Sequence, residues 1–343
     1  MTTIGMLHFR KHPSTVIKAY AYAAAAKMEG IEFFYFSFGK VNTESKKIEG
    51  YKYENGSWIL GTFSYPDVIY NAGGADSELQ SEVDRLLREW VPFTSFSIGN
   101  KMSVYKRIKK GKDFLHYLIP TESVSALRTI TKFFERYDKI VMKPVSGRKG
   151  ENIVLFEKLT SQEYRILVRR KEIFLNAKQF GQYVMDLLLI NKWVVQPYIK
   201  SVTKDGNPFD FRLHVQKDGF GEWVITSIYP RVTVKGIVSN ISSGGYTNIV
   251  EDFLRIEYDD DYFNMKRYLE HFALSFATHF DKLYEKPLDE LGIDVGIDEN
   301  RKAWIYEVNW RPGTPPTYSL ELDVARNMIQ YAVFLAGVKT NEK

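Results

Sequence analysis

Two carboxylates near the carboxyl end of the chain have the spacing of a metal site. Residues 291–298 and 303–310 each alternate apolar and polar side chains, and the polar turn 299–302 joins them. This pattern predicts a β-hairpin. Closing the hairpin pairs position 298 with 303, and counting back pairs Asp294 with Glu307. We therefore expect these two acids to lie side by side on one face.

Asn309 follows on the same predicted face, whereas Tyr306 and Val308 belong to the opposite one. Two carboxylates that face each other across strands repel unless a positive charge lies between them or one is protonated. Carboxylate and amide oxygens suit Mg²⁺, and Gly296 leaves room for a ligand to approach. The alternative is the solvent-facing side of an amphipathic hairpin.

A second group of residues has the composition of a phosphate-binding loop. Lys143 ends the apolar strand predicted over 139–143, and two more cations follow in a short glycine-containing loop. Backbone N–H groups in such a loop can bind an anion. The loop residues concerned are Ser146, Gly147 and Gly150. The segment does not match the Walker A pattern, because a strand rather than a helix follows it. The alternative is an ordinary turn.

Two further segments carry polar residues suited to binding anions. Asp210, Arg212 and His214 share one face of a predicted strand, for which a salt-bridged sheet surface is the alternative. The Ser- and Gly-rich stretch 238–246, which contains Asn240, could close over a phosphate or could be a plain surface loop. His8 is a candidate for acid–base work, although single histidines often have structural roles.

The elements that must position these residues alternate between strands and helices at the start of the chain. This order predicts a parallel sheet whose loop at 71–74 lies at a strand's carboxyl end, where α/β proteins bind ligands. Later segments predict mainly strands, a long helix and a terminal helix. The expected strands are 3–9, 31–38, 66–70, 139–143, 152–156 and 193–199, with a hairpin over 40–64, and the expected helices are 13–29, 101–110, 180–189, 260–284 and 322–338.

Composition narrows the class of protein. The chain has 343 residues, of which 44% are hydrophobic and 26% charged, as in an ordinary folded protein. It has no cysteine, which excludes disulfides, thiol nucleophiles and cysteine-ligated metals and fits a reducing compartment such as the cytoplasm. We expect no membrane span, because no window approaches 18 consecutive apolar residues. We expect no nucleic-acid partner, because the net charge of +5 is modest.

The order of these motifs resembles the ATP-grasp superfamily over about residues 95–320. The segment Glu307–Gly313 (EVNWRPG) resembles the ending of D-alanine–D-alanine ligases, and Asp294 precedes it at the same interval. The D-F-R and N-I-S-S-G-G elements are similar to those of ribosomal-protein glutamate ligases. Residues 50–71 resemble the YheC/YheD endospore coat-associated ATP-grasp proteins, except that Ala72 and Gly73 replace an arginine of that group.

The resemblance implies a set of site residues. Asp294, Glu307 and Asn309 would bind Mg²⁺, as two ions, with Mn²⁺ as the alternative metal. ATP would be bound by phosphate contacts, by a hinge that reads adenine and by a residue near the ribose: Lys101, Lys143, Ser146, Gly147, Gly150, Gln196, Pro197, Tyr198, Ile199 and Asp210. The residues facing the γ-phosphate and the acyl group would be Arg212, Arg231, Asn240 and Arg311.

The implied activity is that of an ADP-forming carboxylate–amine ligase. The carboxylate of a small molecule or peptide would attack the γ-phosphate, and an amine would displace phosphate from the acyl-phosphate. A small-molecule kinase and a non-catalytic spore coat protein are the alternatives, and the resemblance makes the spore coat a second possible location. We expect an α/β domain (1–95) followed by two α+β lobes, a central one (96–199) and a C-terminal one with the metal site (200–343).

Overall fold

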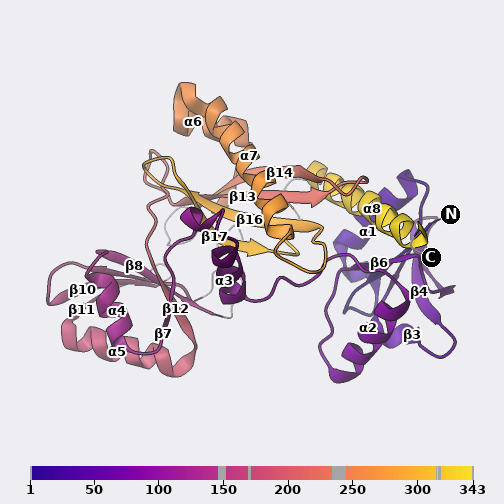
Figure 1. The fold of residues 1–343 in the computed structure, drawn as a ribbon, viewed down its shortest axis with the longest axis horizontal. Coiled ribbons are helices and arrows are strands. Elements are labelled where there is room, and N and C mark those ends of the chain that lie inside the picture. The colour runs from indigo at the N-terminus through magenta and orange to yellow at the C-terminus, as the bar shows by residue number, and fades with distance from the viewer. Residues whose placement is uncertain are drawn as a thin grey trace.

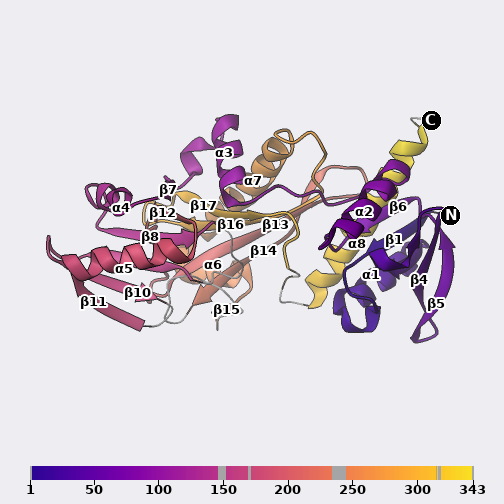
Figure 2. The same ribbon diagram turned by 90° about the horizontal axis from the view of Figure 1, so that it is seen from below.

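The computed structural model describes residues 2–145, 152–168, 171–233, 245–313, 315 and 318–341. Three sheets lie in a row along the molecule, each with its own helices (Figures 1 and 2). The first sheet comes from the N-terminal part of the chain, the second from its centre, and the third from residues beyond 208. In space the third sheet lies between the other two, so the metal-site hairpin of the sequence analysis is central.

The first sheet has the order β3-β4-β2-β1-β6, and β5 pairs with β4. Its buried strands β1, β2 and β6 are parallel, as the strand–helix–strand start predicts. The turn of the β4–β5 hairpin is Asn55-Gly56, with positive φ at both residues, which is the conformation this dipeptide favours. The elements are β1 (Thr3–Leu7), α1 (Ile17–Met28), β2 (Glu32–Phe36), β3 (Val41–Asn42), β4 (Lys47–Glu54), β5 (Ser57–Ser64), β6 (Val68–Asn71) and α2 (Glu78–Trp90).

The second sheet has the order β11-β10-β9-β8-β12-β7, and all its pairings are antiparallel. Two helices cover one face and bury an aromatic core that includes Phe156 and Phe180. Asn176 caps α5 by accepting from the Gln179 N–H, and the Gln179 side chain accepts in return from the Asn176 N–H. The elements are β7 (Glu122–Val124), α4 (Leu127–Phe134), β8 (Lys139–Pro144), β9 (Val154–Lys158), β10 (Glu163–Val168), β11 (Lys171–Asn176), α5 (Ala177–Ile190) and β12 (Trp193–Pro197).

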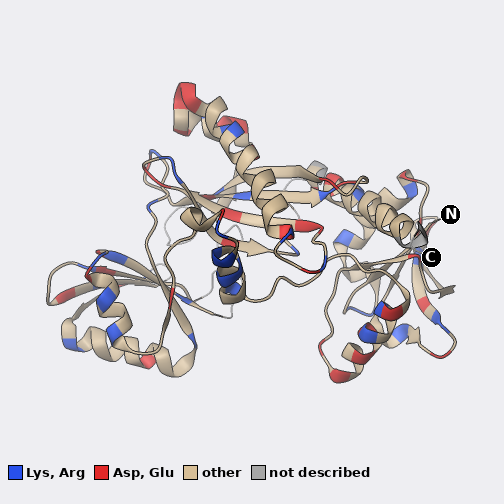
Figure 3. Cartoon of the chain, in the orientation of Figure 1, with Lys and Arg blue, Asp and Glu red and all other residues tan. Residues whose placement is uncertain are grey.

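The third sheet has the order β15-β14-β13-β16-β17. Helix α7 covers one face, because Phe272, Phe276 and Phe280 recur every four residues and so line one side of the helix. Helix α3, the predicted basic helix, is largely blue in Figure 3, where Lys and Arg are coloured, and it packs into the same core through Val104 and Ile108. The elements are α3 (Lys101–Gly111), β13 (Phe209–Lys217), β14 (Trp223–Thr233), β15 (Gly245–Thr247), α6 (Val250–Tyr258), α7 (Tyr262–Asp281), β16 (Glu290–Ile297) and β17 (Ala303–Asn309).

The terminal helix α8 (Tyr318–Asn341) returns to the first sheet. Its residues Ala325, Met328 and Ile329 are buried in one core with Ile4 and Met6 of β1. The sequence predicts this helix but not the element it packs against. None of the helices in the described part of the chain combines the length and the apolar character that crossing a bilayer requires.

Candidate functional site

The β16–β17 hairpin pairs Asp294 with Glu307, as the sequence predicts, and Gly292 with Asn309. The predicted pairing of 298 with 303 is wrong, since Ile297 is the partner of Ala303. The register shifts by one residue next to Asp294, and this bulge brings the two acids opposite each other. The predicted strand register is therefore wrong next to the turn and correct at Asp294 and Glu307.

The bulge reorients Tyr306. The phenol ring lies beside Gly296, because a Cβ built on that glycine would lie 2.2 Å from the Tyr306 hydroxyl oxygen. The prediction that Tyr306 shares a face with Val308 is therefore wrong, and Tyr306 lines the pocket in front of the sheet. Gly296 makes room for this ring, not for a ligand as the sequence suggests.

Asp294 is held by two arginines from the neighbouring strands. Arg212 of β13 donates from Nε and from NH2 (3.1 Å) to the two carboxylate oxygens of Asp294, and the NH2 of Arg231 of β14 lies 3.0 Å from Oδ2. Burial opposes ionisation of Asp294, but the charges of Arg212 and then Arg231 hold its pKa below the usual value. The protein itself thus supplies positive charge for the facing carboxylates.

Arg231 also donates two hydrogen bonds to Asp210, at 2.7 and 2.8 Å, and Asp210 is 1% exposed. The predicted polar face of β13 is therefore a salt-bridged sheet surface, and it is also the surface that carries the site. His214, on the same strand, is fully buried and lies 2.8 Å from the Glu290 carboxylate. His214 therefore belongs to the protein interior and not to the candidate site.

Two lysines approach the same face from other elements. Lys101 stands in the first turn of α3, whose N-cap Asn100 accepts from the Ser103 N–H, and its Nζ lies 3.7 Å from Glu307 Oε1. Lys143 projects from β8 of the second sheet. Burial and then the charge of Lys101 lower the pKa of Lys143 to about 8. A half-buried ammonium at this place is suited to an anionic ligand.

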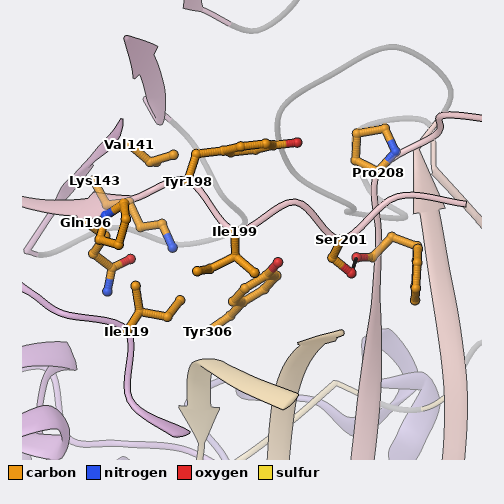
Figure 4. A pocket seen from close by; sticks show the side chains of 11 residues that line it. Ile119, Val141, Lys143, Gln196, Tyr198, Ile199, Ser201, Pro208 and Tyr306 are labelled. Atoms are coloured by element: carbon orange, nitrogen blue, oxygen red, sulfur yellow. Dashed lines mark hydrogen bonds between the residues drawn. The ribbon is translucent and has the colours of Figure 1, made fainter. Parts of the chain in front are cut away.

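The pocket between the second and third sheets lies beside this face (Figure 4). Its empty space is about 510 Å³, part of it open to solvent. The Gln196 amide donates to Thr121 Oγ1 at 2.7 Å, whereas its buried Oε1 has no partner among the described residues. The lining residues include Lys143 and all four predicted hinge residues: Ile119, Val141, Lys143, Gln196, Pro197, Tyr198, Ile199, Ser201, Pro208, Phe209 and Tyr306.

Arg311 contacts the first sheet. Its NH1 donates to the Asn71 carbonyl of the first sheet at 3.4 Å, and its guanidinium stacks on the Trp310 ring at 3.9 Å. The structure thus groups the remaining described site residues on the faces of β8, β12, β13, β14, β16 and β17, with Lys101 opposite Glu307. The predicted residues Ser146, Gly147, Gly150 and Asn240 lie outside the described residues.

The donor set fits a hard divalent cation. Asp294 and Glu307 are cross-strand partners, and Asn309 is one alternation further along the same face. The oxygens are those of two carboxylates and one amide, which is the chemistry Mg²⁺ prefers. Asp294 would share its two oxygens between the metal and the arginines that donate to them. In the described part of the chain no cluster of three or more His, Cys, Asp or Glu side chains competes with this set as a metal site.

Sequence reasoning missed several pocket residues. Val141 lies two residues before Lys143, so strict alternation along β8 could have placed both on the pocket face. Tyr306 could not be found in this way, because the bulge breaks the alternation of β17. Thr121 does not line the pocket itself; it lies just before β7 and reaches the pocket residue Gln196 through the pairing of β7 with β12.

A pocket between two antiparallel sheets, with Lys143 in its lining and paired carboxylates on the hairpin beside it, is the arrangement expected of an ATP-grasp protein. The chain belongs to the YheC/D-like ATP-grasp family, and its match to this family covers residues 90–335. Because this match covers most of the chain, the mixed α/β and α+β architecture expected from the sequence is confirmed.

Three known proteins illustrate the relationship. The chain is 26% identical over 328 residues to the endospore coat-associated protein YheD of Bacillus subtilis (strain 168), covering 88% of this chain and 70% of YheD. It is 24% identical over 333 residues to YheC of the same organism, covering 91% and 89%. The ATP-grasp ligase PsnB, solved with a minimal precursor, Mg and ADP, has a TM-score of 0.58 at 10% identity, over 97% of this chain and 98% of PsnB.

Proposed function

We propose that this protein is an ATP-dependent carboxylate–amine ligase that works through an acyl-phosphate. The observation that carries the proposal is the position of Lys143. It lines the pocket between the second and third sheets, and it also interacts electrostatically with Glu307, Asp210 and Asp294 on the metal-site face. A nucleotide whose base fills the pocket would therefore direct its phosphates towards the paired carboxylates.

The pocket has the chemistry of a purine site. Apolar side chains such as Val141 and Ile199 can contact the two faces of a planar base, and the hinge backbone after Gln196 offers donors and acceptors. The free Oε1 of Gln196 can accept from an exocyclic amino group, which adenine has at the position where guanine carries a carbonyl. ATP is thus the nucleotide proposed.

The charged residues suit phosphoryl transfer to a carboxylate. Asp294, Glu307 and Asn309 would hold magnesium, which supplies charge neutralisation for the phosphates when it is bound. Lys101 and Lys143 would bind phosphate oxygens, and Arg212 and Arg231 would orient the attacking carboxylate. Both arginines are fixed by Asp294 and Asp210, so they are positioned before substrate arrives. An amine would then attack the acyl carbon and displace phosphate.

A hydroxylamine trap tests this proposal. The full chain is incubated with ATP, Mg²⁺ and a panel of carboxylic acids, and hydroxylamine replaces the amine. An acyl-phosphate gives a hydroxamate and one ADP for each hydroxamate formed. ADP release without hydroxamate, and without dependence on any amine, would instead indicate the kinase reaction. The Glu307→Gln variant should form neither product, whereas Glu299→Gln, an exposed carboxylate in the hairpin turn, should react like the wild type.

We further propose an association with the endospore coat, because both Bacillus relatives carry that description. Coat association and catalysis do not exclude each other. Immunoblotting of the coat and cytoplasmic fractions of spores from the source cell would test the location. Recovery from the cytoplasmic fraction alone would contradict it.

A further inference from the structure

The carboxamide of Gln196 lines the pocket and is bonded to the protein on one side only. Gln196 is 9% exposed, its Nε2 donates to Thr121 Oγ1 at 2.7 Å, and its buried Oε1 has no partner among the described residues. Figure 4 shows this side chain beside Lys143 and Ile119. A carboxamide can turn over about its last bond and exchange its oxygen with its nitrogen. What Gln196 offers to a ligand therefore depends on what fixes its orientation.

The hydroxyl of Thr121 fixes this orientation. Its Oγ1 donates its one proton to the Ile119 carbonyl at 2.7 Å. A hydroxyl whose proton is used in this way can only accept a further hydrogen bond. It therefore accepts from Gln196 Nε2, because a carboxamide turned the other way would place two acceptor oxygens against each other. The oxygen of Gln196 is thus the atom that remains for a ligand in the pocket.

The backbone brings the two residues together. Strands β7 and β12 pair antiparallel, with Glu122 opposite Val195. One further step in this register places Thr121 opposite Gln196, so their side chains are cross-strand neighbours on one face. The Thr121 N–H also donates to the hydroxyl of Tyr105, on α3, at 3.3 Å. The hydroxyl that orients the carboxamide is therefore positioned before any ligand binds.

A hydrogen-bond acceptor held in this way distinguishes between purines. Adenine carries at position 6 an amino group that can donate, whereas guanine and hypoxanthine carry a carbonyl that can only accept. A 6-oxo base at this place would bring its carbonyl oxygen to the Gln196 oxygen, and both acceptors would be buried without a donor. Sites that bind a substrate N–H group through a buried polar partner strongly reject the analogue that lacks it.

We propose that Thr121 sets the nucleotide specificity of the pocket by holding the Gln196 oxygen towards position 6 of the base. The selected ligands are 6-aminopurine nucleotides, and the excluded ones are 6-oxopurine nucleotides. Thr121 acts through Gln196 and is not among the described residues that line the pocket, so it is a positioning residue. This inference rests on the proposed function, which assigns the pocket to a nucleotide.

Calorimetry on the full chain tests the specificity without any turnover. The probes are ADP and IDP, each titrated with Mg²⁺ present, because their bases differ only at position 6 and in the proton on the adjacent ring nitrogen. The wild type should bind ADP at least about tenfold more tightly than IDP. Equal affinities for the two nucleotides would overturn the proposal.

Variants connect this preference to the Thr121 hydroxyl. Thr121→Val lets the carboxamide turn over, so the preference for ADP should fall at least about fivefold, and Thr121→Ser should restore it. The matched control is Thr131→Val on α4, an exposed threonine whose hydroxyl donates to the Arg128 carbonyl at 3.0 Å, and it should keep the wild-type preference. A wild-type preference in Thr121→Val would overturn the proposal. Thr121→Ala has the same expected result and replaces Thr121→Val if that variant does not fold.

A double-mutant cycle tests whether Thr121 acts through Gln196. Gln196→Leu removes the acceptor and should itself lower the preference for ADP at least about fivefold. Adding Thr121→Val to Gln196→Leu should then change the preference by less than about twofold, because nothing is left for the hydroxyl to orient. A full further loss in the double variant would mean that Thr121 acts by another route, which contradicts the proposal.

The two proposals fail in different ways. Equal rates of hydroxamate formation with ATP and with ITP, each at a subsaturating concentration, would leave the ligase function intact and reject the role of Thr121. A preference for ADP that Thr121→Val loses, together with no ADP release from ATP with any acid, would support the role of Thr121 and reject the ligase. Failure of both ADP and IDP to bind would reject both proposals.

Discussion

The two facing carboxylates are expected to differ sharply in what they contribute to stability. Asp294 is 5% exposed and accepts hydrogen bonds from Arg212 and Arg231. Asp294→Asn leaves two buried guanidinium groups with one fewer negative charge, and breaking a buried pair in this way costs about 3–5 kcal/mol. The side chain of Glu307 is 36% exposed and that of its partner Lys101 27%, so Glu307→Gln should cost no more than about 1 kcal/mol.

Both substitutions should remove activity, because each deletes a carboxylate that we assign to the metal. The assay is therefore a pair of measurements on each variant: chemical denaturation without metal or nucleotide, and ADP release with Mg²⁺. Glu307→Gln should lose at least about 100-fold in turnover while its unfolding midpoint stays near that of the wild type. An equal loss of stability in the two variants would refute this interpretation of the site, as would normal turnover of Glu307→Gln.

Three more perturbations test other parts of the structure. Burial lowers the pKa of Lys143 to about 8, so its positive charge is lost as pH rises from 7 to 9, and ATP affinity should fall over that range. Lys143→Met should bind ATP at least about tenfold more weakly, and it should unfold at a higher denaturant concentration at pH 7 because no desolvated charge remains. ATP affinity that does not change with pH in calorimetry would contradict this. Burial and then the charge of Glu290 raise the pKa of Asp289 to about 7, so the folded state holds a proton there that the unfolded state releases near pH 4. The contribution of Asp289 to stability should therefore decrease as pH rises from 4 to 7, by as much as about 4 kcal/mol, so denaturation curves should show the stability of Asp289→Asn relative to the wild type rising over this range. Gly296→Ala places a methyl group against Tyr306 and should cost about 1–3 kcal/mol and weaken ATP binding, whereas the same stability as wild type would mean that the ring moves freely.

Sequence periodicity is sufficient to predict the strands that carry the site. The alternation along 291–298 and 303–310 predicts the two strands, and the Asn55-Gly56 turn fixes the β4–β5 hairpin. The pairing of Asp294 with Glu307 is predicted correctly only because the bulge offsets the wrong pairing of 298 with 303. The strand and turn predictions depend on local geometry, which period-two patterns and turn residues encode directly.

The partners of the charged side chains are not encoded locally. Asp210 and Arg212 lie on one face of β13, but their partners depend on β13 lying between β14 and β16. That order brings Arg231 to Asp210 and Asp294 to Arg212. The bulge at Tyr306 likewise depends on the gap beside Gly296, which only the paired strands reveal. The predicted domain limits at 95 and 199 stay predictions.

The place of α8 affects the order in which the protein can fold during synthesis. The core around β1 includes Ala325, Met328, Ile329 and Ala336, so β1 leaves the ribosome well before residues that it packs against. Ribosomes add about 5–20 residues per second, so the first sheet waits tens of seconds for its final helix. During that time the apolar surfaces of β1, β6 and α1 have no cover from α8, which makes the nascent N-terminal sheet a natural client for chaperones.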